Sequence, residues 1–164
     1  HTGHSVYATL HAETVEQVLR RMTNPPINIP SVMLEALHMV AVQYRDRRKG
    51  IRRLYQMAEL VPVGEAGGRV NIEINMLYRY KANDKISKQS ESIRVFDTLR
   101  MHTGFTTQEI NQDLVEKTEI IQWLTANNID NVNDVGKIIS EYYLDSEKVL
   151  KAARMKISPK KFFG

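Results

Sequence analysis

The chain has 164 residues, of which 42% are hydrophobic and 26% are charged, as is typical of soluble globular proteins. The absence of cysteine excludes disulfide bonds and thiolate metal sites, and no apolar run approaches the roughly 20 residues needed to span a bilayer. The formal net charge of +4 permits contact with anionic lipid or nucleic acid but does not argue for either.

The chain is expected to begin with a short strand followed by a helix. Residues 5–10 favour a strand because they are rich in β-branched and aromatic residues. Thr14 and Gln17 then have the spacing of a capping box, which predicts the start of a helix. That helix is expected to end at residues 24–26, because a residue before proline is pushed out of helical geometry.

A second helix and an antiparallel hairpin follow. Ser31 is in a position to cap the helix, and Val32 is among the residues expected to pack inward. Residues 39–44 and 51–61 are predicted to form two neighbouring antiparallel strands. Residues 46–50 supply the turn between them, which is rich in arginine and ends in glycine.

The clearest strand signal lies in residues 70–80, where apolar and polar residues alternate over the whole run. A strand with one buried face has this pattern. The glycine-rich residues 64–68 before it are predicted to be a loop. Residues 81–89 after it are polar and lack periodicity, so we place a domain boundary there.

The rest of the chain is predicted to be helical. Residues 93–100 form one helix, closed by Gly104. Thr106 and Glu109 make a second capping box, which opens a longer helix that ends near Asn127. The inward face of that longer helix is expected to hold Ile110, Leu114, Ile121 and Leu124.

A third helix is predicted over residues 135–142, and residues 149–155 continue it or form a fourth. The resulting organisation is an α/β region at residues 1–82, a helical C-terminal region at residues 83–157, and a loose basic tail at residues 158–164.

Two short motifs near the start carry a family resemblance. Residues 2–4 (Thr-Gly-His) and 9–12 (Thr-Leu-His-Ala) resemble the histidine box of the P-loop ATPases of type II and type IV secretion, pili and the archaellum. Residues 24–30 are similar to the segment that follows this box in archaeal members. Residues 40–61 resemble their valine-rich and arginine-rich hairpin, and residues 116–143 resemble their C-terminal helices.

The resemblance implies the C-terminal part of a RecA-like P-loop ATPase domain, followed by an α-helical region. Family members are cytoplasmic hexamers at the inner face of the membrane. They hydrolyse ATP with Mg²⁺ and act on a polytopic membrane platform protein to assemble or export pilin-like subunits.

This chain contains no G-x-x-x-x-G-K-[ST] motif and no Walker B acidic pair. Residues 136–138 (Gly-Lys-Ile) match only the Gly-Lys of the first motif, without its upstream glycine or its hydroxyl residue. Both motifs precede the histidine box in the family. The isolated chain is therefore expected to hold neither ATP nor Mg²⁺ and to be inactive.

The resemblance makes His11 and His4 the candidate catalytic residues. On a strand, an offset of seven residues would put them on opposite faces and roughly 23 Å apart, which argues against a shared metal or a joint action on one atom. His11 would follow the strand and precede a helix, where P-loop domains bind phosphates, so it is expected on the γ-phosphate side. His4 is expected to order the opposite end or meet a neighbouring domain. Thr9 is either a second polar contact or an ordinary strand residue.

The densest charge in the chain lies in and beside the predicted turn. It allows three interpretations: a solvated turn, which is the most favoured, a subunit-interface patch in a ring, or a contact with nucleic acid. Nucleic acid is the least favoured partner, because such a site normally has interleaved aromatic residues or a recognition helix, and only Tyr44 and Tyr55 are nearby. A standalone interaction or nucleic-acid-binding module using this hairpin and the C-terminal helices is the alternative function. The candidate interface residues are Arg45, Arg47, Arg48, Arg52 and Arg53, and Lys49 belongs to the same cluster of charge.

Overall fold

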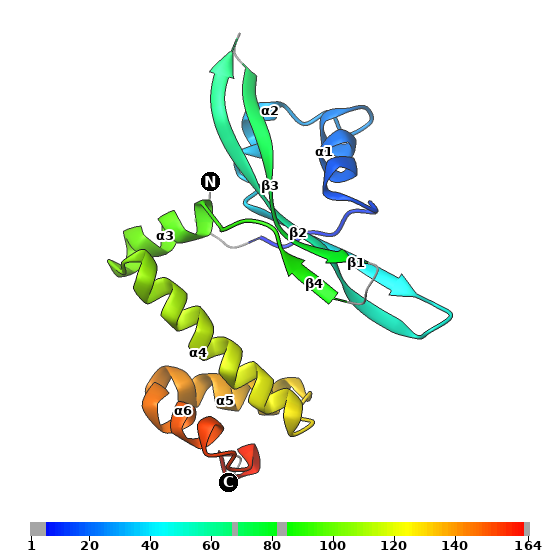
Figure 1. Ribbon diagram of the computed structural model, residues 1–164. Helices are drawn as coiled ribbons and strands as arrows, with labels where there is room; N and C mark the ends of the chain where they lie inside the picture. Colours follow the sequence, from blue (N-terminus) through cyan, green and yellow to red (C-terminus); the bar gives the residue numbers. More distant parts are fainter. Residues whose placement is uncertain (1–5, 67–68, 82–84, 163–164) are drawn as a thin grey trace. The chain divides into compact units, whose positions relative to one another are not determined.

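The computed structural model describes residues 6–66, 69–81 and 85–162 (Figure 1). It is a mixed α/β structure that divides into a sheet unit, residues 1–98, and a helical unit, residues 99–164. The sequence places its boundary at residue 82, whereas the compact sheet unit includes a further strand and the start of a helix. Among the described residues, no helix is long and apolar enough to cross a membrane.

The sheet unit is built on four antiparallel strands in the order β1-β2-β3-β4, so that consecutive strands are neighbours. This arrangement confirms the predicted hairpin and the strand predicted from alternation. The strands are β1 (Met39–Asp46), β2 (Ile51–Ala66), β3 (Arg69–Lys81) and β4 (Lys85–Lys88).

Two stretches predicted to be irregular belong to the sheet. Strand β2 continues through Glu65 and Ala66, which pair with β3, although residues 64–68 were expected to be a loop; residues 67–68 lie outside the described part. Strand β4 lies within the polar residues 81–89 and pairs with the end of β3. Its side chains lack an alternating pattern because backbone pairing to β3, rather than burial, defines it.

Helix α1 (Val15–Thr23) packs against the sheet and forms its main core. Thr14 caps the helix as predicted, with its hydroxyl accepting a hydrogen bond from the backbone N–H of Gln17 at 3.2 Å. Burial of each large side chain in such a core contributes about 1.5–3 kcal/mol. The buried members of this cluster are Val15, Val18, Val40, Val42, Ala58 and Leu60.

Helix α2 (Ser31–Leu34) differs from its prediction in two details. Pro30 rather than Ser31 is the N-terminal cap residue, and no side chain caps the helix. Leu34 is buried, but Val32 is 53% exposed. On a helix, two positions two residues apart point to nearly opposite sides, so this four-residue helix cannot bury both.

The strand predicted at residues 5–10 is not formed in its described part. Residues 6–12 are irregular, and Val6 and Tyr7 are 81% and 95% exposed; residue 5 lies outside the described part. A strand needs a neighbour to satisfy its backbone groups, and none of the described strands pairs with this segment.

A buried carboxylate holds the start of α3 (Arg94–Thr103). Glu59 on β2 is fully buried and accepts hydrogen bonds from the N–H groups of Ile93 at 2.8 Å and Val95 at 3.1 Å, and from the Ser92 hydroxyl. Burial tends to raise the pKa of Glu59, but these hydrogen bonds together outweigh it and hold the pKa below its usual value. The sheet is thereby tied to the helix that leads out of it.

Arg94 makes a second set of hydrogen bonds between the start of α3 and the sheet unit. Its guanidinium donates hydrogen bonds to three backbone carbonyl oxygens: Leu60 at 2.7 Å, Glu35 at 2.9 Å and Leu37 at 3.3 Å. One side chain thus joins the start of α3, strand β2 and the segment after α2.

The helical unit confirms the predicted helix ends. Gly104, with a φ of 72°, follows α3 in the left-handed conformation that glycine adopts most easily. Both halves of the capping box between Thr106 and Glu109 are present. Residues 149–155, which could have continued the third helix, belong to a separate fourth one. The elements are α4 (Thr107–Ala126), α5 (Val132–Leu144), α6 (Ser146–Arg154) and a 3-10 turn, η1 (Pro159–Phe162).

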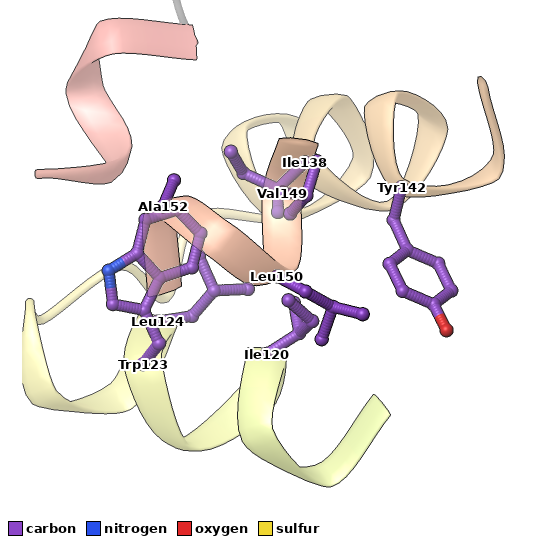
Figure 2. Packing of buried hydrophobic residues seen from close by; sticks show 8 residues of the cluster. All are labelled: Ile120, Trp123, Leu124, Ile138, Tyr142, Val149, Leu150 and Ala152. Carbon is purple, nitrogen blue, oxygen red and sulfur yellow. The ribbon is translucent and has the colours of Figure 1, made fainter. Parts of the chain in front are cut away.

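Figure 2 shows the core of this unit, where side chains from α4, α5 and α6 converge. Of the four residues predicted on the inward face of α4, Ile110 and Leu124 are buried, which confirms that part of the prediction. The other two are exposed, Ile121 to 49% and Leu114 to 45%, whereas Ile120 is only 1% exposed. Apolar residues lie on more than one side of α4, so their spacing does not identify the covered side. The buried members are Ile120, Trp123, Leu124, Ile138, Tyr142, Val149, Leu150 and Ala152.

The C-terminal residues predicted to be loose are packed as far as residue 162. The Trp123 indole N–H donates a hydrogen bond to the carbonyl oxygen of Ile157 at 2.9 Å. The Phe162 ring meets the Trp123 ring edge-on at 6.1 Å between centroids, and Pro159 is buried. These aromatic contacts could not be read from the basic composition of the tail.

Candidate functional site

Of the three residues that the sequence places at the nucleotide, two lie in the described part of the chain. His11 and Thr9 are both exposed, in the irregular segment that leads into α1. His4 lies outside the described residues. The structure therefore brings His11 to the entry of a helix, as expected, but without the strand before it.

The first turn of α1 uses its own backbone N–H groups. The N–H of Val15 donates to the Gln56 side-chain oxygen at 2.9 Å, and that of Gln17 donates to the Thr14 hydroxyl. A hydrogen bond from its own backbone N–H, aided by Thr14, lowers the pKa of Glu16. The N–H groups of Val15, Glu16 and Gln17 are therefore already engaged and are not free to bind an anion at this end of α1.

Gln56 lies directly behind this turn. It is 1% exposed, and its side-chain NH₂ has no hydrogen-bond partner among the described residues. Buried polar groups are normally paired, and the hydrogen-bond partner of this amide is the Val15 N–H, whose hydrogen bond its oxygen accepts. Gln56 thus fixes where α1 begins, and with it the position of the segment that carries His11.

The arginine-rich turn is ordered by one acidic side chain. A carboxylate oxygen of Asp46 accepts hydrogen bonds from the N–H groups of Arg48 at 2.9 Å and Lys49 at 3.1 Å. Above the turn, Arg45 faces Arg52 across the two strands. Like charges directly opposite each other are destabilising, so this pair does not contribute to the stability of the hairpin.

A groove of about 770 Å³ opens between the start of α1 and the strands. Two of the predicted interface residues, Arg45 and Arg53, line it, whereas Arg47, Arg48 and Arg52 are exposed outside it. We call this hollow the tyrosine groove. Its lining comes from residues 12–14 and 42–46, together with Lys49, Arg53, Tyr55 and Tyr80.

Three tyrosines form the aromatic part of the lining of the tyrosine groove. The Tyr44 and Tyr55 rings lie 6.2 Å apart, and Tyr44 is 47% exposed. The guanidinium of Arg53 lies 4.6 Å from the centre of the Tyr80 ring and donates a hydrogen bond to the Tyr80 hydroxyl at 2.6 Å. The strand register shifts between Val42 and Gln43, next to Tyr55, and such irregularities redirect side chains.

Sequence reasoning missed the tyrosine groove as a unit. Tyr44 and Tyr55 were noted only as aromatic neighbours of the turn, and Tyr80 only as part of an alternating strand. Counting back from the predicted turn, residues 46–50, places Tyr44 opposite Arg52, one residue away from Arg53, its partner in the structure. No local pattern indicated that Tyr80 joins them, because it comes from β3.

No group of three or more His, Asp or Glu side chains in the described part of the chain could hold a metal ion. No protein-family model matches the chain.

Three curated proteins of Methanocaldococcus jannaschii are similar to the chain, all with names that give no function. The uncharacterized protein MJ0781 is 31% identical over 89% of this chain and 20% of its own length. MJ1287 is 29% identical over 86% of the chain and 52% of its own length, and MJ0900 is 24% identical over 87% and 26%. The chain thus spans between about a fifth and about half of the relatives it matches.

Proposed function

We propose that the chain is the C-terminal part of a secretion, pilus or archaellum P-loop ATPase, with the end of the RecA-like domain in its sheet unit. The observation that carries the proposal is the position of His11, exposed three residues before the Thr14 cap of α1. The histidine-box resemblance requires a histidine at the entry to a helix, and an imidazole there can donate a hydrogen bond to a phosphate oxygen.

Two further observations support the proposal. The similar proteins are archaeal, as are the family members that the hairpin and residues 24–30 resemble, and they are longer than this chain. The arginines of the hairpin lie on an exposed turn, which suits the predicted contact with a neighbouring subunit of a hexamer.

In this proposal, ATP and Mg²⁺ are bound mainly by residues outside the chain. The described residues do not fit either group: the sequence has no glycine-rich phosphate loop, and no cluster of carboxylates comes together. The chain contributes His11, with Thr9 beside it, and the surfaces that meet other subunits. His4 remains a candidate from the resemblance.

The proposal also covers the partner proteins of the motor and its localisation in the cell. The helical unit is the part that we assign to contacts with neighbouring subunits or with a polytopic membrane platform protein. The complete motor would then work in the cytoplasm at the inner face of the membrane and drive the assembly or export of pilin-like subunits.

We expect the His11→Ala variant of the complete gene product to lose roughly 100-fold in kcat for ATP hydrolysis, the effect of removing one donor at a developing charge. Nucleotide binding should change little, because the P-loop supplies most of it. The measurement is steady-state ATP turnover alongside the dissociation constant of a fluorescent ATP analogue.

His102→Ala is the matched control, because His102 is an exposed histidine near the end of α3 and is not part of the histidine-box residues. It should keep full turnover. If His11→Ala retains normal kcat, or if His102→Ala loses as much, the assignment of His11 is wrong.

A further inference from the structure

The tyrosine groove and the turn beside it bring aromatic rings and positively charged side chains together. The groove holds three tyrosines and the cations Arg45, Lys49 and Arg53, against Glu13 and Asp46 as its acidic members. Arg47, Arg48 and Arg52 continue the positive charge over the exposed hairpin. Cations alone suit many anions, but cations beside aromatic rings suit a ligand that carries phosphates and flat bases together.

The three tyrosines differ in how far their rings are free to stack on a base. Arg53 lies against the Tyr80 ring and binds its hydroxyl, so this pair forms a fixed wall. Tyr55 is half-buried and packs against the sheet core. Tyr44 is the most exposed of the three and is inclined at 43° to Tyr55, so it is the ring best placed to receive a base.

We propose that the tyrosine groove binds single-stranded nucleic acid. A base stacks on Tyr44, while Arg45 and Lys49 contact the phosphates on either side of it. The backbone then continues over the arginines of the turn. This binding goes beyond the proposed ATPase function. It uses the hairpin arginines that we assigned there to a subunit contact, so the two contacts would compete for one surface; failure of the binding would leave the ATPase proposal unchanged.

A single strand fits this surface better than a duplex. In a duplex the base faces are stacked on one another and cannot stack on a tyrosine ring of the groove. The described residues also place no helix at the hairpin that could enter a major groove, since the basic residues lie on strands and a turn. The exposed cations number more than one phosphate would need, which favours a strand over a mononucleotide.

The test is the fluorescence anisotropy of a labelled oligothymidine of about 12 nucleotides, titrated with the purified chain at roughly 50 and 200 mM salt. We expect binding that weakens with salt and is stronger than binding to a duplex of the same length. An abasic strand with the same number of phosphates should bind more weakly than oligothymidine, because it has no base to stack on Tyr44.

Two pairs of variants separate stacking from diffuse charge. Tyr44→Ala should raise the dissociation constant roughly five- to tenfold, and Tyr44→Phe should not, because a phenyl ring still stacks. Tyr143→Ala is the control for Tyr44→Ala, since Tyr143 is a 71% exposed tyrosine in the helical unit.

Arg45→Gln combined with Lys49→Gln should reduce the slope of log K against log salt by about 1.4, because two phosphate contacts are lost. The same loss of charge at Lys160 and Lys161, which are exposed in the helical unit, should leave most of the slope in place. Circular dichroism of each variant checks that it is folded.

The proposal is overturned by no binding to oligothymidine, by a duplex bound as tightly as the single strand, or by equal effects of Tyr44→Ala and Tyr143→Ala. Equal changes in slope for the two charge pairs would also contradict it, since they would indicate a general attraction to the basic chain.

Discussion

Replacing Glu59 with glutamine is expected to lower the free energy of unfolding of the sheet unit by about 3 kcal/mol. The side chain is fully buried and accepts hydrogen bonds from the backbone at the start of α3 and from Ser92 and Asn75. Glutamine has nearly the same shape, but it brings an NH₂ group that must face N–H donors. The measurement is hydrogen exchange of the β2 and β3 amides under increasing urea.

The matched control is Glu73→Gln on β3, where the carboxylate is exposed and the change should cost little. The pH dependence gives a second readout. Because the pKa of Glu59 is lowered in the folded chain, its contribution is present above the unfolded value of about 4.3 and is lost as the pH falls through the folded value. Glu59→Gln should therefore flatten the acid-induced loss of stability seen in the natural chain. If it leaves both stability and that pH profile unchanged, Glu59 does not hold α3 in place.

Ile120→Ala is expected to destabilise the helical unit by about 3 kcal/mol, because it removes most of a side chain that is 1% exposed among α4, α5 and α6. Trp123 is the only tryptophan of the chain and belongs to the same cluster. Its fluorescence during urea unfolding therefore reports on this unit directly.

Ile121→Ala is the neighbouring control. Ile121 is 49% exposed, so the same truncation should cost less than about 1 kcal/mol. The comparison decides which side of α4 is covered, since the spacing of apolar residues alone favoured Ile121. A larger loss for Ile121→Ala than for Ile120→Ala would show that the core is built on the other face.

Elements with a complete local signal could be predicted from the sequence. The capping pairs at Thr14 and Thr106 and the left-handed Gly104 are local features, and each ends or begins a helix where expected. The alternation over residues 70–80 predicted β3 because Ile72, Ile74 and Met76 on one face of that strand are partly buried against the core of the sheet unit. In these cases the residues that specify the element lie within the element.

Where the determining contact is distant in sequence, prediction failed. Residues 6–10 have the composition of a strand but no described neighbour, whereas β4 has no strand-like pattern and forms by pairing with β3. Leu77 falls on the polar side of the alternation over residues 70–80 but is buried, at the point where the register of β2 and β3 shifts.

For the candidate sites as well, local features could be predicted from the sequence and contacts between distant residues could not. His11 could be placed before a helix from local residues alone. The grouping of Tyr44, Tyr55 and Tyr80 depends on three strands coming together, and the role of Glu59 depends on a helix that starts more than thirty positions later. Charge could be read from the sequence, but the side chains that surround it could not.

The most direct test of the proposed ATPase function is ATP turnover by the complete gene product and by the isolated 164-residue chain, measured with Mg²⁺ under the same conditions. The complete protein is predicted to hydrolyse ATP, and the isolated chain is predicted to show no turnover above background, because it lacks a phosphate-binding loop. The proposal is contradicted if the complete protein does not hydrolyse ATP, or if the isolated chain does and loses that activity with His11→Ala.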